Sequence, residues 1–426
     1  MPESNTKKLC FYFQLHQPLR ISDYSIFDID SNKDYFVGPK SGTNQELFDR
    51  ISDKCYLPMV ELMYKMSIEF NIHWSVSMSG TWIDQAEKFR PDVISAFQKL
   101  SKTGCLEILG ETYYHSLASL KSKKEFAEQV SLHTRKIRAV FSLYPQVFRN
   151  TELIYNNDIA NFVREMGFDG MLAEGWNLGE KSANYLYTAR HHEISENDKE
   201  IIDYVFHRIR KPKDLKVLLR NYQLTDDIGF RFGNPGWDEH PLTAEKYLSW
   251  IDNAPGDVVN IFMDFETFGE HKWEDSGIFD FIYHFGRLSH EKYKWSTVSE
   301  VVKTLQAKDE IDMHFPISWA DMERDLSAWL GNKMQQNAFE DIFALEEKVK
   351  EAALYLRKIP EKKKLLDTWR KLQTSDHIYY MSTKYWNDGD VHKYFSPYAS
   401  PYEAFINYMN VLQDFRRKIN KISEDE

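Results

Sequence analysis

The feature that most constrains the fold is a repeated alternation of short apolar segments with longer helical stretches. It runs over roughly the first 280 residues, and the stretch 124–141 is one of the helical examples. Seven segments are rich enough in β-branched and aromatic residues to predict strands: 9–15, 73–78, 106–109, 147–149, 168–172, 215–219 and 260–264. Strands that alternate with helices predict a parallel α/β sheet, and a barrel suits a segment of this length.

The pattern changes after about residue 299, where apolar residues recur at helical spacing. One series is Ile342, Leu345, Val349, Ala352 and Leu356, and another is Phe405, Met409, Leu412 and Ile419. The C-terminal third therefore predicts a helical bundle packed against the barrel. We divide the chain into a barrel of residues 1–300 and a helical domain of residues 301–426, although no linker marks the border.

Charge and cysteine usage exclude some classes of partner. The formal net charge of −11 argues against nucleic acid, because binding to phosphates relies on basic patches. No apolar run is long enough to cross a membrane, and the N-terminus lacks the apolar stretch of a secretory signal. The three cysteines, Cys10, Cys55 and Cys105, are widely spaced and odd in number, which favours a reducing cytoplasm.

Polar side chains gather where four of the predicted strands end, which is where the chemistry of a parallel α/β barrel takes place. So many desolvated polar groups are costly unless they serve a site. The four groups are His16 with Gln17; Glu111 with His115; Arg149, Asn150 and Glu152; and Asp264, Glu266, Glu270 and His271.

Two chemistries use carboxylates and histidines of this kind. In glycoside hydrolysis one carboxylate attacks the anomeric carbon while a carboxylic acid protonates the leaving oxygen. In metal-assisted hydrolysis histidine and aspartate bind Zn²⁺. The sequence contains no HExxH motif, no Gly-rich phosphate loop and no GxSxG elbow. The residue types therefore favour the glycosidase, and the metal-dependent reading stays open.

Five ordered segments resemble the sequence regions of glycoside hydrolase family 57, the α-amylase and 4-α-glucanotransferase family. They are FQLHQP, GETYYHSL, FRNTELIY, MDFETFGEHKW and SWADMERDLSAWLGNKMQQNAF, and the last three look most like the α-amylase subgroup. The resemblance implies an incomplete seven-stranded (β/α) barrel followed by a helical region. It also implies retention of anomeric configuration and no cofactor, and we predict no metal ligand among the site residues. Glu152 falls on the family's nucleophile and Asp264 on its general acid/base.

We expect the remaining polar residues to bind substrate or to orient the two carboxyl groups. This predicted set is His16, Gln17, Glu111, His115, Trp237, Glu266, His271, Asp376 and His377. Trp237 lies in a Gly- and Pro-rich loop and is a candidate stacking platform. Asp376 and His377 come from the helical part and would form an edge of the site.

The predicted substrate is an α-glucan, such as maltodextrin, starch or glycogen, cleaved at α-1,4 bonds. A 4-α-glucanotransferase would use the same residues but would transfer to a sugar rather than to water. A metal-dependent carbohydrate hydrolase or deacetylase, and a non-catalytic glucan-binding protein, are the alternatives from other classes. The sequence predicts no particular oligomeric state.

Overall fold

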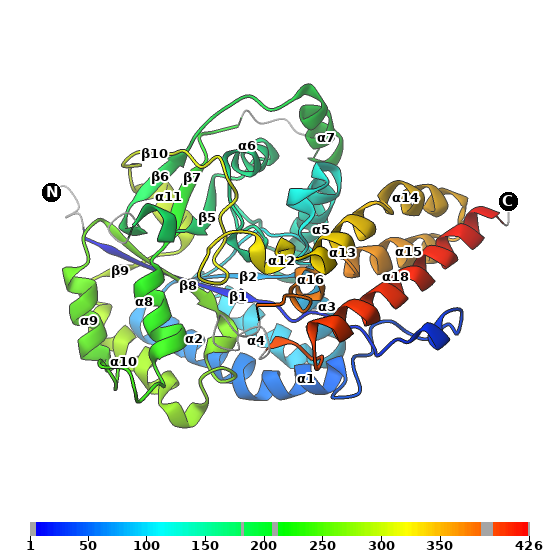
Figure 1. Cartoon of the computed structure of the whole chain (residues 1–426). Coiled ribbons are helices and arrows are strands. Elements are labelled where there is room, and N and C mark those ends of the chain that lie inside the picture. Colours follow the sequence, from blue (N-terminus) through cyan, green and yellow to red (C-terminus); the bar gives the residue numbers. More distant parts are fainter. Residues whose placement is uncertain (1–5, 180–182, 207–211, 385–394, 425–426) are drawn as a thin grey trace.

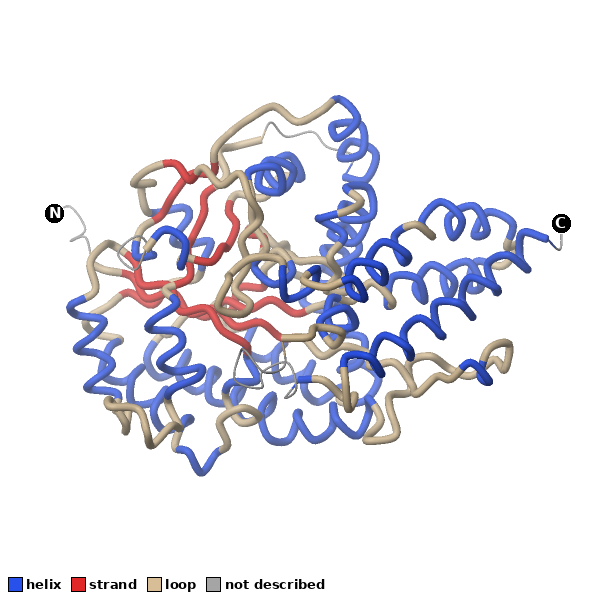
Figure 2. The backbone as a smooth tube through the Cα atoms, in the orientation of Figure 1, coloured by secondary structure: helices blue, strands red, loops and turns tan. Residues whose placement is uncertain are grey.

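The computed structural model describes residues 6–179, 183–206, 212–384 and 395–424. It is an α/β fold in which short strands lie among helices (Figures 1 and 2). The strands are β1 (Lys8–Leu15), β2 (Trp74–Met78), β3 (Leu106–Ile108), β4 (Val147–Phe148), β5 (Gly170–Glu174), β6 (Leu186–Ala189), β7 (Lys216–Arg220), β8 (Val258–Asp264), β9 (Lys294–Trp295) and β10 (Glu310–Ile311).

These strands form two sheets. The first has the order β3-β2-β1-β8, with β9 also paired to β1, and all of its pairs are parallel. The second has the order β10-β6-β7-β5-β4 and is parallel except for the β6–β7 pair. Because β4, β5 and β7 run the same way, their carboxyl ends meet at one edge.

Backbone hydrogen bonds join the two sheets at both sides. Gly110, just after β3, forms a parallel bridge with Phe148 of β4. On the other side, the Asn221 N–H after β7 donates to the Asn260 carbonyl of β8 at 2.9 Å. One apolar cluster draws residues from both sheets, including Tyr12 of β1 and Leu172 of β5. The carboxyl ends of β4 and β8 therefore belong to the same end of the molecule.

The helices cover the sheets and fill the C-terminal third (Figure 1). Those of the first part are α1 (Asn44–Ile51), α2 (Leu57–Phe70), α3 (Gly80–Phe89), α4 (Pro91–Ser101), α5 (Lys123–Phe141), α6 (Asn157–Met166), α7 (Glu196–Phe206), α8 (Tyr222–Asp226), α9 (Ala244–Asn253), α10 (Ile278–Ser289) and α11 (Val298–Thr304). Those that follow are α12 (Ser327–Leu330), α13 (Lys333–Phe343), α14 (Glu346–Tyr355), α15 (Ile359–Lys371), α16 (Ser375–Tyr379) and α18 (Pro401–Glu424).

All seven predicted strands and the predicted helix at 124–141 are confirmed, with ends that differ by at most a few residues. Three further strands, β6, β9 and β10, were not predicted. Strands β9 and β10 have two residues each, one of which is an exposed charged residue, so they contain no apolar run like that of the equally short but fully buried β4. Strand β10 pairs with β6, so residues 310 and 311 belong to the second sheet although they lie beyond residue 300.

Most residues of the two predicted apolar series lie on helices, whereas Leu345 and Leu356 flank α14 on either side. Ile342, Val349 and Ala352 are buried on α13 and α14, and Leu412 and Ile419 on α18. Helix α14 packs against α15 and α18, and this group shares one apolar cluster with strands of the second sheet. Within the ranges that the structure covers, no helix is both long and apolar enough to cross a membrane.

Candidate active site

Glu152 lies in a short helical turn, Thr151–Leu153, directly after β4. Its backbone has φ 56° and ψ 28°, and Leu153 has φ 52°. Two successive non-glycine residues in the left-handed region are strained, and such strain is concentrated at functional sites. The Glu152 Oε1 accepts a hydrogen bond from His115 Nε2 at 3.0 Å, and Oε2 accepts one from Trp319 Nε1 at 2.7 Å. Both carboxylate oxygens are therefore held in place.

His115 links Glu152 to a second carboxylate. Its Nδ1 lies 3.5 Å from Oε2 of Glu111, a fully buried residue that Gln14 also contacts through Nε2 at 3.4 Å. Burial alone would lower the pKa of His115, but the hydrogen bonds with Glu111 and Glu152 outweigh it and raise that pKa to about 9. The ring is therefore an imidazolium that donates to two carboxylates.

Opposing effects act on the pKa of Glu152. Burial raises it, but the hydrogen bond and charge of His115, together with the Arg149 charge, lower it below its ordinary value. Arg149 is completely buried, and its guanidinium carbon lies 4.9 Å from the centre of the Trp319 ring. Its three side-chain nitrogens have no hydrogen-bond partner among the residues that the structure describes. Arg149 acts on the site as a buried positive charge.

Asp264 is the last residue of β8, at the same end of the sheets as Glu152. Burial and then the negative charge of Glu152 raise the pKa of Asp264 to about 6, against the opposing charges of Arg149 and His115. Glu152 and Asp264 are therefore driven towards opposite protonation states. Pairs of carboxyl groups with separated pKa values are the usual means of assigning one acid and one base.

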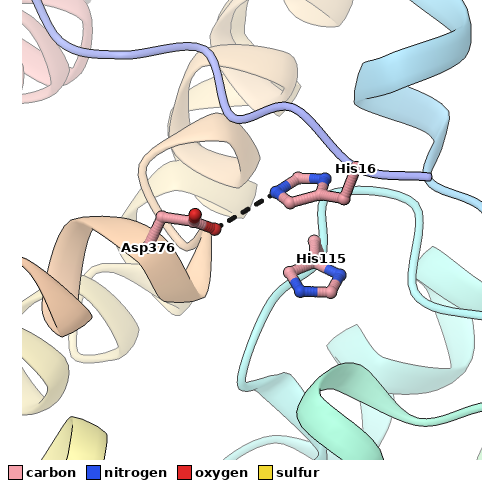
Figure 3. Close-up of side chains that lie close together, drawn as sticks. All are labelled: His16, His115 and Asp376. Atoms are coloured by element: carbon pink, nitrogen blue, oxygen red, sulfur yellow. Dashed lines mark hydrogen bonds and ion pairs between the residues drawn. The ribbon is translucent and has the colours of Figure 1, made fainter. Parts of the chain in front are cut away.

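His16 and Asp376 bring the end of β1 against the C-terminal helices (Figure 3). The His16 Nε2 lies 3.1 Å from Asp376 Oδ2, and its Nδ1 lies 2.7 Å from Ser79 Oγ. Burial and then the charge of His115 lower the pKa of His16, whereas the pKa of Asp376 is lowered despite its burial, through His16. A neutral His16 can thus donate to an ionised Asp376 and accept from the Ser79 hydroxyl.

His16, His115 and Asp376 each offer one potential metal ligand, and these atoms lie within 4.8 Å of one another. However, the two imidazole rings are stacked, with centroids 4.0 Å apart and an interplanar angle of 20°. The nitrogen lone pairs lie in the ring planes, so in stacked rings they run side by side and do not converge on one ion. Metal binding would require one of the two rings to rotate out of the stack and to lose hydrogen bonds that it makes in this arrangement.

Gln17 and Glu266 meet beside Asp264. The Gln17 Nε2 donates to Glu266 Oε1 at 3.2 Å, and the Tyr56 hydroxyl donates to the same oxygen at 2.6 Å. Burial and then the charge of Asp264 raise the pKa of Glu266 to about 8. The two hydrogen bonds to Glu266 connect the segment after β1 and residues 52–56 to the turn after β8.

Three other predicted site residues lie away from these hydrogen bonds. His271 has a pKa lowered to about 4 by burial, and its ring packs edge-on against Phe395 at 5.5 Å. The pKa of His377 is also lowered to about 4 by burial, and its ring lies 6.0 Å from that of Tyr408. Trp237 packs against Trp250 of α9 at 6.0 Å. A role for these three in substrate binding stays a prediction.

Several residues that contact the site carry no individual signal in the sequence. Trp319 lies within the fifth matched segment and Arg149 within the third, but neither position by itself predicts a role. Gln14 is a polar residue inside an otherwise apolar strand, a signal that could have identified it. No local signal marks the buried charged group beside Trp319, because its members come from distant segments: Glu174, Arg220, Asp226 and Arg324.

The fold and the comparison with known sequences place the protein in the class of glycoside hydrolases. The sequence profile of glycosyl hydrolase family 57 matches residues 10–314, and the chain belongs to this family. It is 39% identical over 421 residues to the "Putative alpha-amylase" of Methanocaldococcus jannaschii, an alignment that covers 97% of this chain and 85% of the relative. The family resemblance seen in the sequence is therefore confirmed.

Solved structures agree with this assignment at the level of the fold. The branching enzyme of Pyrococcus horikoshii superimposes with a TM-score of 0.66 and 11% identity, covering 98% of this chain and 94% of that one. The 4-alpha-glucanotransferase of Thermococcus litoralis gives a TM-score of 0.57 with 16% identity over 92% of this chain. The chain spans 54% of the length of that glucanotransferase.

Proposed function

We propose that this glycoside hydrolase cleaves α-1,4 bonds of α-glucans with retention of configuration, using Glu152 as nucleophile and Asp264 as general acid/base. The observation that carries the proposal is the arrangement of two carboxyl groups at the same end of the two sheets: Glu152, held through both oxygens by His115 and Trp319, and Asp264 at the end of β8. The pKa of Glu152 is lowered through His115 and Arg149, while burial and the Glu152 charge raise that of Asp264 to about 6.

In the first step a Glu152 oxygen bonds to the anomeric carbon while the bond from that carbon to the glycosidic oxygen breaks. The departing oxygen takes the proton of Asp264. In the second step the Asp264 carboxylate removes a proton from water, whose oxygen bonds to the anomeric carbon and releases Glu152. Double displacement requires the two carboxyl groups to lie about 5–5.5 Å apart.

The hydrogen bonds around Glu152 fit the role of nucleophile. His115 and Trp319 each occupy one of its oxygens, which keeps the group ionised and limits its rotation. Glu111, His16 and Asp376 stabilise His115 in turn, through its other nitrogen and through ring stacking. We infer that these residues position the carboxylates and the sugar hydroxyls.

The architecture implied by the family resemblance is part of the same proposal. We infer that β1–β5, β7 and β8 form an incomplete seven-stranded barrel, supported by the hydrogen bonds between the two sheets. We further propose that residues 301–426 act as a helical domain that supplies Asp376 to the site. The cytoplasmic location rests on cysteine usage: Cys10, Cys55 and Cys105 are all buried and unpaired.

Product analysis with maltoheptaose tests the function. We expect the wild-type enzyme to release shorter maltooligosaccharides, and Glu152→Gln and Asp264→Asn to reduce the rate by at least about 10²-fold. With Glu152→Gly, azide should restore turnover and give a glycosyl azide of inverted configuration, because the small anion occupies the vacated space. The Glu107→Gln enzyme is the control, since Glu107 is a carboxyl group of β3 that accepts hydrogen bonds from Ser75 and Ser299 and does not belong to the predicted site.

Three further outcomes distinguish the alternative functions, and the first is read from the same chromatogram. Oligomers longer than maltoheptaose would indicate a 4-α-glucanotransferase acting through the same residues. Activity that chelators abolish and Zn²⁺ restores would replace the two-carboxylate mechanism by a metal-dependent one. Binding of maltoheptaose without any product would leave a glucan-binding protein.

A further inference from the structure

An exposed tryptophan stands at the same sheet edge as Glu152 and has no part in the chemistry described so far. Trp176 lies two residues after the end of β5, and its side chain is 47% exposed. Tyr222 lies two residues after the end of β7. Since β4, β5 and β7 are adjacent parallel strands, Glu152, Trp176 and Tyr222 follow three neighbouring carboxyl ends.

The backbone of Trp176 is fixed although its ring is exposed. The fully buried Glu174 accepts the N–H groups of Gly175 and Trp176 on Oε1, at 2.8 and 2.9 Å, and pairs through Oε2 with Arg220 at 3.1 Å. Gly175 allows a close approach here, since a Cβ at this position would lie 2.3 Å from the Arg220 carbonyl oxygen. A side chain presented from so rigid a turn loses little conformational entropy on binding a ligand.

A continuous series of contacts joins this ring to the nucleophile. The Arg324 guanidinium carbon lies 5.7 Å from the centre of the Trp176 ring. Arg324 also donates to the Trp319 carbonyl, and the Trp319 indole donates to Glu152 at 2.7 Å. One arginine and one tryptophan therefore separate Trp176 from the carboxylate.

The surroundings of Trp176 select for a neutral, flat ligand. The ring of Tyr222 meets that of Trp176 edge-on, with centroids 4.5 Å apart and an interplanar angle of 64°. The positive charge of Arg324 is balanced by Glu174 and Asp226, so the ring has no excess cation beside it that would attract an anion. A pyranose ring presents a face of C–H groups that packs well on an aromatic surface, with its hydroxyls at the rim.

We propose that Trp176, with Tyr222 at its edge, is a binding platform for a glucosyl unit of the substrate chain other than the unit that reacts at Glu152. The identity of the ligand rests on the proposed function. A platform of this kind makes cleavage depend on chain length, because only substrates long enough to reach it gain the additional contact.

The test compares kcat/KM on maltoheptaose with kcat/KM on the shortest maltooligosaccharide that the wild-type enzyme cleaves. For Trp176→Ala we expect a loss of about tenfold on maltoheptaose, mainly through a higher KM, with the short substrate unaffected. Trp176→Phe should restore most of the loss, since it keeps an aromatic face. The matched control is Tyr144→Ala: Tyr144 is 58% exposed and has Arg138 at 5.0 Å, but it precedes β4 and lies at the opposite sheet edge.

An equal loss on long and short substrates, no loss on either, or the same loss in Tyr144→Ala would overturn the platform while leaving the proposed activity intact. If the wild type cleaves no maltooligosaccharide, the proposed activity fails and calorimetry with maltoheptaose decides the platform separately. The platform is supported if the Glu152→Gln/Trp176→Ala enzyme binds maltoheptaose about tenfold more weakly than the Glu152→Gln enzyme does. Unchanged or undetectable binding overturns it.

Discussion

At the scale of single residues, the difference between Glu152 and Asp264 depends on a few buried positive charges. Both groups are partly buried, and burial by itself would raise both pKa values. His115 reverses this effect for Glu152 because it donates directly to that carboxylate, whereas it reaches Asp264 only through its charge. Arg149 lowers both pKa values and so sets the pH range in which one carboxyl is ionised and the other protonated.

We therefore expect a bell-shaped pH dependence of kcat/KM, which reports ionisations of the free enzyme. Asp264 must be protonated to act as an acid, so activity should fall as the pH rises through about 6. Glu152 must be ionised, so activity should fall on the acid side only below the ordinary range of a glutamate. Removal of the Arg149 charge in Arg149→Met should raise both pKa values and move both limbs to higher pH.

Arg149→Lys is the control for this prediction, because it keeps the charge and should leave the limbs nearly in place. Initial rates on maltoheptaose across the pH range, at substrate concentrations well below KM, would give the two profiles. If Arg149→Met lowers kcat/KM at every pH but leaves both apparent pKa values unchanged, the electrostatic role of Arg149 is contradicted.

At the scale of secondary-structure elements, the sequence predicted the strands that carry Gln14 and Asp264, because long buried strands have a strong hydrophobic pattern. It could also place His16 and Glu152 at strand ends. It could not predict that Trp319, from an irregular segment, donates to Glu152, since that contact joins residues 167 positions apart. Such long-range contacts are fixed by tertiary packing and leave no periodicity in the sequence.

The position of helix α16 leads to a prediction at this scale, because α16 brings Asp376 into hydrogen-bonding contact with His16, just after β1. Asp376→Asn removes the negative charge that holds the neutral His16 ring in position. Without that charge, we expect the His16 ring to lose its stacked arrangement with His115. We expect a loss in kcat of roughly ten- to hundredfold, as for other small displacements of positioning groups. The melting temperature should change little, since the Asp376 side chain is 24% exposed.

The control is Asp367→Asn on α15, which removes the charge of a carboxylate that likewise bonds to the first part of the chain, where it accepts from the Tyr114 hydroxyl at 3.0 Å. It should leave kcat unchanged. Steady-state kinetics and circular dichroism on both variants would check the prediction, and equal kcat values for Asp376→Asn and the wild type would refute it.

At the scale of the whole molecule, the C-terminal helices are joined to the sheets by both apolar and charged contacts. One apolar cluster contains Met171 of the second sheet together with Val349 and Trp369 of the C-terminal helices. Across the same boundary, Arg370 of α15 donates to the fully buried Glu125 of α5, from Nε at 2.7 Å and from Nη2 at 3.1 Å. A core shared in this way predicts that both parts unfold together.

Arg370→Met tests this coupling, because it leaves the Glu125 carboxylate buried with Gln129 at 2.9 Å and the more distant Lys350 at 3.7 Å. Removal of one partner of a buried ion pair costs about 3–5 kcal/mol of unfolding free energy. The loss of unfolding free energy should be smaller in Glu125→Gln/Arg370→Met, because the carboxylate that Arg370 neutralised is absent from that variant. The exposed pair of Lys358 and Glu361 supplies the control, since Lys358→Met should have little effect.

Urea unfolding followed by tryptophan fluorescence and by circular dichroism would measure these changes. Because α5 and α15 belong to one core, we expect the two signals to give one coincident transition that moves to lower urea in Arg370→Met. A first transition that shifts alone, ahead of an unchanged second one, would mean that the C-terminal helices unfold independently. In that case Asp376 would leave the site before the sheets unfold, and activity would be lost with the first transition.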